Sequence, residues 1–224
     1  HGKFRAIAFK SKGNSEEHIA LVRGKVSGKE NVPLRIHSQC LTGDVFGSFR
    51  CDCHAQLISA LKKISKSKEK SVVIIKGGPG TGKSVIALEV MGELLRMGKN
   101  VVHATGSSAF TNTLRKILGT RSAKQFKFFN SFMKQGEEVD VLICDEAHRI
   151  RKTSESMYTP GALRTGEPQI NELIRSAKMS IFFIDEHQVV RPGEIGSVNL
   201  IKESAEKFGA KIYELPELQT QFRC

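Results

Sequence analysis

The sequence Gly77-Gly78-Pro79-Gly80-Thr81-Gly82-Lys83-Ser84 fits the phosphate-loop pattern GxxxxGK(S/T) at each of its fixed positions. A β-branched apolar run precedes it at 71–76 and an apolar run with helical spacing follows it at 85–91, which is the context that this pattern requires. The glycines let the backbone curl so that its N–H groups point at a polyanion, and the positive end of the following helix faces the same phosphates. We therefore predict that Lys83 reaches the β and γ phosphates of a nucleoside triphosphate and that the Ser84 hydroxyl holds Mg²⁺.

A second acidic motif begins 62 residues after Lys83, where the apolar strand 139–144 ends in Asp145-Glu146-Ala147-His148. An acidic strand end that merely faces solvent is the alternative, but a complete phosphate loop in the same chain favours a role in hydrolysis. We predict that Asp145 holds the Mg²⁺ and that Glu146 polarises the attacking water.

The order of elements after residue 70 predicts an α/β fold with a parallel sheet flanked by helices, and a ligand site at the carboxyl ends of its strands. We expect strands at 71–76, 100–104, 139–144, 180–184 and 211–214, and helices near 83–97, 107–118, 129–135, 168–177 and 197–208. Before it, strands at 4–9, 18–22 and 34–37 and a helix at 55–64 predict a small α+β unit. The predicted domains are therefore 1–64 and 71–224, joined by a polar Lys/Ser-rich linker at 65–70.

Two further motifs make the second domain resemble a known family. They are Asp185-Glu186-His187-Gln188 after an apolar strand and the terminal Gln221-Phe222-Arg223. With the phosphate loop and the Asp-Glu-Ala-His strand end, they occur in this order in superfamily 1 helicases, and the chain is most similar to the bacterial helicase-like domain related to Schlafen proteins.

That resemblance implies a RecA-like lobe that binds and hydrolyses ATP with Mg²⁺ and acts on DNA or RNA. It implies that Gln188 senses the γ phosphate, that Arg223 is the arginine finger, and that Thr105-Gly106-Ser107-Ser108 touch a nucleic-acid backbone. Helicases of this kind have a second RecA-like lobe whose motifs are absent from this sequence, so we expect the nucleotide site to need that missing lobe for full turnover.

Three cysteines before the linker, Cys40, Cys51 and Cys53, follow the pattern C-x10-C-x-C. Three thiolates with an open fourth position are typical of catalytic zinc, whose bound water ionises near neutral pH. His37 or His54 could instead close the site as a structural zinc knuckle, and reduced cysteines without a metal are the remaining alternative.

The stretch from about residue 4 to residue 61 resembles the first part of GTP cyclohydrolase II, the zinc enzyme that opens the guanine ring of GTP to begin riboflavin synthesis. The matching features are the Thr42-Gly43-Asp44 turn and the three cysteines, which the resemblance makes zinc ligands. It also makes Arg35, His37, Ser38 and Gln56 nucleotide contacts. The family's downstream nucleotide contacts, general base and catalytic arginine have no counterpart here, and Gln39 replaces a glutamate that is usual before the first zinc cysteine.

The whole chain has 224 residues, 39% hydrophobic content and a formal net charge of +12. No apolar stretch approaches the length of a membrane span and no secretory segment is evident, so we expect a cytoplasmic protein without a membrane partner. The charge fits a polyanionic partner, and a basic face for nucleic acid is predicted at Arg121, Lys124, Lys127, Arg149, Arg151 and Lys152, although a solvated surface explains such residues equally well. A zinc-stabilised recognition module without catalysis is the third alternative for the N-terminal unit.

Overall fold

The computed structural model of the protein describes residues 5–10, 17–22, 24–29, 53–67, 69–134, 136, 138–155, 159–161, 164, 166–188 and 191–218. The chain divides into two compact units, His1–Ile36 and His37–Cys224. Within the first unit, strands β1 (Arg5–Lys10) and β2 (Glu17–Val22) form an antiparallel pair in which Arg5 lies opposite Val22 and Lys10 opposite Glu17.

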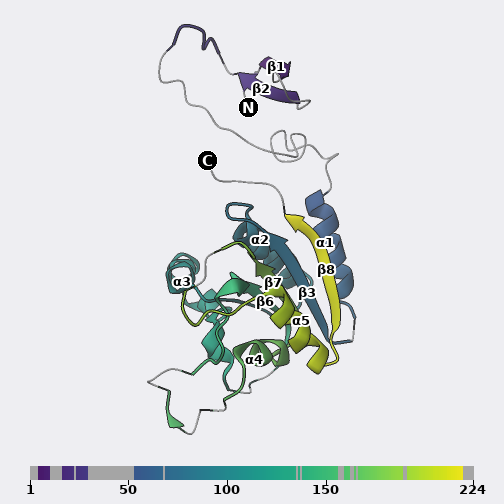
Figure 1. The fold of residues 1–224 in the computed structure, drawn as a ribbon, viewed down its shortest axis with the longest axis vertical. Helices are drawn as coiled ribbons and strands as arrows, with labels where there is room; N and C mark the ends of the chain where they lie inside the picture. Colours follow the sequence, from purple (N-terminus) through teal and green to yellow (C-terminus); the bar gives the residue numbers. More distant parts are fainter. Residues whose placement is uncertain are drawn as a thin grey trace. The chain divides into compact units, whose positions relative to one another are not determined.

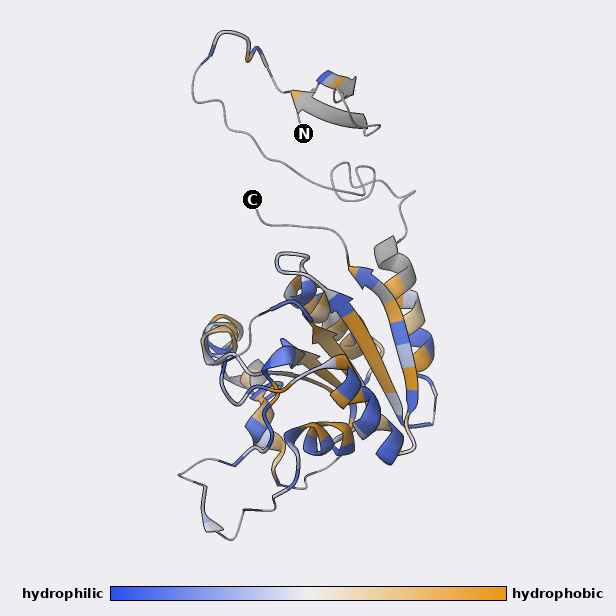
Figure 2. Cartoon of the chain, in the orientation of Figure 1, coloured by the Kyte–Doolittle hydropathy of each residue, from blue (hydrophilic) through white to orange (hydrophobic). Residues whose placement is uncertain are grey.

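The second unit is built on a six-stranded sheet with the order β5-β4-β6-β7-β3-β8, in which all strands are parallel (Figure 1). The strands are β3 (Ser71–Gly77), β4 (Val101–Thr105), β5 (Phe126–Phe128), β6 (Val139–Asp145), β7 (Ala177–Ile184) and β8 (Lys211–Leu218). The central strands are buried nearly continuously, as expected of a parallel sheet that is covered on both faces. Figure 2 shows the corresponding band of hydrophobic residues along β3.

Helices cover the two faces of this sheet and form two hydrophobic clusters with it. On one face, Val73 and Ile75 pack with residues of α1 (Cys53–Ile64) and α2 (Lys83–Arg96). On the other, Val72 and Ile74 pack with α4 (Gln169–Arg175), α5 (Val198–Lys207) and the short 3-10 helix η2 (Phe129–Phe132). Successive residues of β3 therefore serve opposite layers, because side chains alternate across a strand.

Helix α1 belongs to the core of the second unit. Its residues Ile58 and Leu61 are 9% and 1% exposed and pack against the α2 face of the sheet. The connection from α1 to β3 is also anchored, because Lys70 Nζ donates to the carbonyl of Ala177 at 2.8 Å and pairs with Glu138 at 3.0 Å. The predicted domain boundary at residues 65–70 stays a prediction, but the helix before it packs with the unit after it.

The α/β fold with a parallel sheet flanked by helices is confirmed, and each of the five strands expected after residue 70 is present. One further strand, β5, was not expected, because three residues are too few to show a periodicity. The helix expected at 129–135 is wrong in type: Phe129–Phe132 forms a single 3-10 turn whose buried phenylalanines, Phe129 and Phe132, fill the core. Helix α3 runs over Ser108–Ala123, with a break at Gly119, where φ is 76°. The strand expected at 34–37 lies outside the described residues.

The segment after β7 folds back over the strand end of β6. The N–H of Ile195 donates to the carbonyl of Ile150 at 2.7 Å, and a Cβ built on Gly196 would lie 2.0 Å from the carbonyl oxygen of Ala147. Real Cβ atoms do not approach backbone this closely. Glycine at 196 is therefore required for this segment to lie against the Asp-Glu-Ala-His turn.

We expect Gly196→Ala to destabilise the protein by about 3 kcal/mol, because rigid backbone atoms would have to move apart. Urea unfolding followed by circular dichroism would measure this change. Gly92→Ala in α2 is the matched control: a Cβ there meets nothing within 4 Å, and alanine favours a helix by up to about 1 kcal/mol over glycine. Equal stability of the two variants would contradict the close approach at Gly196.

Candidate functional site

The phosphate loop joins the carboxyl end of β3 to the first residue of α2. Its shape depends on glycine, because Gly80 and Gly82 both have φ of 79°, a conformation that side chains other than glycine rarely adopt. The Thr81 hydroxyl donates to the Gly78 carbonyl at 2.9 Å and closes the turn. The loop therefore has the backbone curl that the sequence pattern predicts.

Lys83 points back under this loop and is held by three oxygen atoms. Its ammonium donates to the carbonyls of Gly77 and Gly78 at 2.6 and 2.7 Å, and it lies 3.4 Å from Asp185 Oδ2. The Asp185 side chain is 0% exposed and that of Lys83 is 10% exposed. This buried ion pair occupies the base of the phosphate loop.

Asp185 was not among the predicted site residues. It follows the last residue of β7, the strand hydrogen-bonded beside β3, and its Oδ1 accepts from the N–H of His187 at 3.1 Å. An aspartate that directly follows a buried strand was a usable signal, since carboxyl ends of neighbouring parallel strands meet at one edge.

Asp145 ends β6 at the same edge of the sheet and has one unsatisfied oxygen. Its Oδ1 accepts from the N–H of Glu146 at 2.9 Å, whereas Oδ2 is buried without a hydrogen-bond partner among the described residues. Burial raises the pKa of the Asp145 carboxyl above its ordinary value, and the nearby Ser84, the N–H of Glu146 and the charge of Lys83 only partly offset that rise. A free carboxylate oxygen next to a serine hydroxyl is a donor set that suits Mg²⁺.

Glu146 has an unusual backbone. Its φ of 53° and ψ of 47° make it the one non-glycine residue with positive φ in the part of the chain that the structure describes. Arg149, at the end of the 3-10 turn η3 (Ala147–Arg149), brings its Nε to 2.9 Å from Glu146 Oε2. Left-handed backbone outside glycine costs about 1 kcal/mol or more and tends to occur at functional sites.

Two buried histidines lie at the acidic motif, His103 beside it and His148 within it, and neither was predicted as a site residue. His103 in β4 is 1% exposed, and burial lowers its pKa to about 4. Its Nε2 lies 3.9 Å from Asp145 Oδ2, so a neutral imidazole faces the carboxylate without an ion pair. His148 is 2% exposed, neither ring nitrogen has a partner among the described residues, and burial lowers its pKa as well.

The depressed pKa of His103 predicts a loss of stability in acid. The unfolded chain binds a proton near the ordinary histidine pKa of 6.5, whereas the folded chain does so only at a pKa of about 4. Stability from this group is therefore fully present above pH 6.5 and is lost as pH falls toward 4, by about 2 to 3 kcal/mol. We expect this fall in urea unfolding experiments on the wild type.

His103→Leu is the comparison, because leucine can fill the space between Phe110 and Phe126, whose rings lie 5.9 and 5.6 Å from the imidazole. Its unfolding free energy should fall less between pH 6.5 and pH 4.5 than that of the wild type. An identical fall in both proteins would mean that His103 does not titrate in this way.

The structure says less about the other predicted site residues. Gln188 is exposed, three residues after Asp185. Cys53 and Gln56 lie on α1, whose backbone is described at those positions although their side chains are not. The remaining ones lie outside the described residues, namely Arg35, His37, Ser38, Cys40, Cys51 and Arg223.

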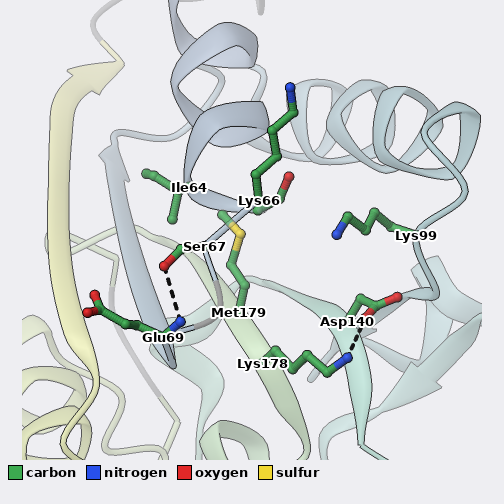
Figure 3. Close-up of a pocket in the computed structure, with 9 residues that line it drawn as sticks. Ile64, Lys66, Ser67, Glu69, Lys99, Asp140, Lys178 and Met179 are labelled. Carbon is green, nitrogen blue, oxygen red and sulfur yellow. Dashed lines mark hydrogen bonds and ion pairs between the residues drawn. The ribbon is translucent and has the colours of Figure 1, made fainter.

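A separate cleft of about 320 Å³ opens at the opposite edge of the sheet (Figure 3). It is lined by Lys66, Lys99, Lys178 and Asp140, among others, and Lys178 pairs with Asp140 at 2.9 Å. Because these residues lie near the amino ends of β6 and β7, the cleft is distinct from the phosphate loop.

In the described part of the chain, no helix is long and apolar enough to cross a bilayer.

The parallel sheet, the loop at Gly77–Ser84 and the acidic ends of β6 and β7 define an α/β phosphate-loop fold. The family described as "Schlafen group 3, DNA/RNA helicase domain" matches residues 70–224, and GTP cyclohydrolase II matches residues 1–120. The chain therefore belongs to the Schlafen group 3 helicase domain family and, through its first half, to the GTP cyclohydrolase II family. Both matches include residues 70–120.

Among curated proteins, the riboflavin biosynthesis protein RibBA of Nocardia farcinica is 40% identical over 104 residues, which are 46% of this chain and 25% of that protein. RibBA of Mycobacterium tuberculosis is 46% identical over 86 residues, 37% of this chain and 20% of the relative. The chain thus spans a quarter or less of these relatives.

Among solved structures, unliganded Pif1 from Bacteroides sp. has a TM-score of 0.43 at 14% identity, covering 76% of this chain and 42% of that one. Pif1 helicase from Candida albicans has a TM-score of 0.41 at 15% identity, covering 77% of this chain and 40% of that one.

Proposed function

We propose that this chain binds ATP with Mg²⁺ at Gly77–Ser84 and hydrolyses it, as the first RecA-like lobe of a helicase-type protein that acts on DNA or RNA. One observation carries the proposal: the Lys83 ammonium lies under the phosphate loop beside Asp185, next to an Asp145 whose Oδ2 has no partner in the described region. Membership of the Schlafen group 3 helicase domain family supports it.

In this proposal the incoming phosphates replace the present partners of Lys83. The backbone N–H groups of the loop and the Lys83 ammonium would bind the β and γ phosphates. Ser84 and Asp145 would hold Mg²⁺, which would supply positive charge to offset the phosphate oxygens. Glu146 accepts a proton from water as the water oxygen forms a bond to the γ phosphorus. The bond from that phosphorus to the β–γ bridging oxygen breaks, and ADP leaves with the electron pair.

Two further roles come from the family resemblance. Gln188 would contact the γ phosphate, and Arg223 would stabilise charge on it as the arginine finger. A second RecA-like lobe would close over these residues and exclude water.

Nucleic acid is the proposed partner of the surface around β4 and η3. The turn Thr105–Ser108 leads from β4 into α3, and Arg151 and Lys152 follow η3 as exposed cations. Lys124 is exposed before β5, at the other end of α3. The whole chain has a net charge of +12, and these cations would attract a polynucleotide backbone.

A second candidate function rests on the match of residues 1–120 to GTP cyclohydrolase II. In it Cys40, Cys51 and Cys53 would hold zinc, which would supply an activated water for opening the guanine ring of GTP, and Arg35, His37, Ser38 and Gln56 would contact the nucleotide. The same cysteines could instead stabilise a recognition module without catalysis. A cytoplasmic location remains a prediction for all three functions.

One set of assays separates these functions. Phosphate release from ATP and from GTP should depend on Mg²⁺ and disappear in Lys83→Ala, and it should be unaffected in Cys51→Ser. Formate release from GTP that is lost in Cys51→Ser would instead establish the cyclohydrolase function. Metal analysis without zinc would exclude the zinc functions, and phosphate release that survives in Lys83→Ala would exclude hydrolysis at the phosphate loop.

A further inference from the structure

Arg149 links two parts of the molecule that are far apart in sequence. Its Nε lies 2.9 Å from Glu146 Oε2. A Cβ built on Gly106 would lie 2.7 Å from Arg149 Cβ and 3.3 Å from Arg149 Cδ, so the stem of the arginine rests directly on the β4–α3 turn. One side chain thus joins the glutamate of the acidic motif to the turn proposed to touch nucleic acid.

The β4–α3 turn beside this arginine is held in place by its own contacts. Thr105 is buried, and its hydroxyl oxygen accepts from the N–H of Ser107 at 3.1 Å, which holds the turn in place. A Cβ on Gly106 would also lie 3.5 Å from Phe129 Cε2, so the turn is backed by the core. Arg149 therefore lies against a fixed surface rather than a loose loop.

The ion pair engages the carboxylate that is proposed to accept the proton from water, although Oε2 has no hydrogen bond among the described residues. One carboxylate oxygen faces the guanidinium at 2.9 Å, and the Glu146 side chain is 30% exposed. A guanidinium binds phosphate as well as it binds carboxylate, because its planar N–H donors match both. A phosphate on the turn would therefore compete with Glu146 for Arg149.

We propose that Arg149 is a positioning residue that holds Glu146 back until a polynucleotide phosphate on the β4–α3 turn draws the guanidinium away. This inference rests on the proposed function, since it concerns the rate of hydrolysis at the same site. Arg151 and Lys152, exposed next to Arg149, would bring the polyanion to this position.

The test measures ATP hydrolysis by the full chain with and without single-stranded oligothymidylate or oligouridylate. We expect the oligonucleotide to raise the wild-type kcat, and Arg149→Ala to raise the kcat without oligonucleotide by about three- to five-fold, the range that a partly exposed ion pair allows. Arg149→Ala should then no longer respond to oligonucleotide, and its KM for ATP should be unchanged. Arg149→Lys should restore the response, because an ammonium still pairs with the carboxylate.

Arg96→Ala is the matched control, since Arg96 and Glu93 form another arginine–glutamate pair with three-residue spacing, on α2. It should behave as the wild type. An Arg149→Ala rate at or below the wild-type rate, with oligonucleotide still stimulating the wild type, would overturn the inference and leave the proposed function intact. If no variant, with or without oligonucleotide, shows hydrolysis that Lys83→Ala abolishes, both the inference and the proposed function are overturned.

Discussion

Lys83→Ala is expected to weaken ATP binding by about 100-fold or more. The substitution removes the ammonium that lies under the phosphate loop, and charge-assisted contacts of this kind contribute about 3 kcal/mol each when buried. Titration with a fluorescent ATP analogue would measure the dissociation constant. Lys178→Ala, at the opposite edge of the sheet, should leave that constant unchanged.

The same substitution should also affect folding, because it leaves the Asp185 carboxylate buried without its partner. Breaking one side of a buried ion pair costs about 3 to 5 kcal/mol. The double variant Lys83→Ala, Asp185→Asn removes the unpaired charge and should recover much of the stability without recovering ATP binding. Recovery of binding in the double variant would show that the single variant fails through misfolding and that Lys83 does not contact the nucleotide.

Glu146→Gln is expected to lower kcat for ATP hydrolysis by about 100- to 10,000-fold while leaving the dissociation constant for ATP within about two-fold of the wild type. Proton transfer by a positioned carboxylate contributes a factor of this size, and the amide keeps the shape but cannot accept the proton. Single-turnover phosphate release measures the chemical step directly. Glu203→Gln, an exposed position on α5, is the control. Equal single-turnover rates for Glu146→Gln and the wild type would remove Glu146 from the catalytic step.

The sequence predicted the frame of the site well, because its signals are local. The spacing of Gly77 to Ser84 between two apolar runs indicates a strand, a loop and a helix, and the structure has them in that order. Asp145 and Glu146 were found in the same way, as polar residues directly after an apolar strand. The roles predicted for these residues remain to be tested by the substitutions above.

What the sequence could not predict depends on which strands are neighbours. Asp185 meets Lys83 because β7 lies between β3 and β6, and His103 faces Asp145 because β4 lies beside β6. No periodicity within β7 or β4 indicates this order. The contact of Arg149 with Gly106 is of the same kind, since it joins the segments that follow the neighbouring strands β4 and β6. Pairing of distant segments is set by tertiary packing rather than by local pattern.

Helix α1 begins at one of the predicted zinc ligands and packs into the core of the second unit. Its 12 residues form a rod of about 18 Å that starts at Cys53, a predicted zinc ligand, and places Ile58 and Leu61 in the core beside α2. A shift of the first turn of α1 would therefore move side chains that support the helix carrying Lys83 and Ser84. The packing of α1 against α2 thus relates the backbone that carries Cys53 to the helix that begins with Lys83.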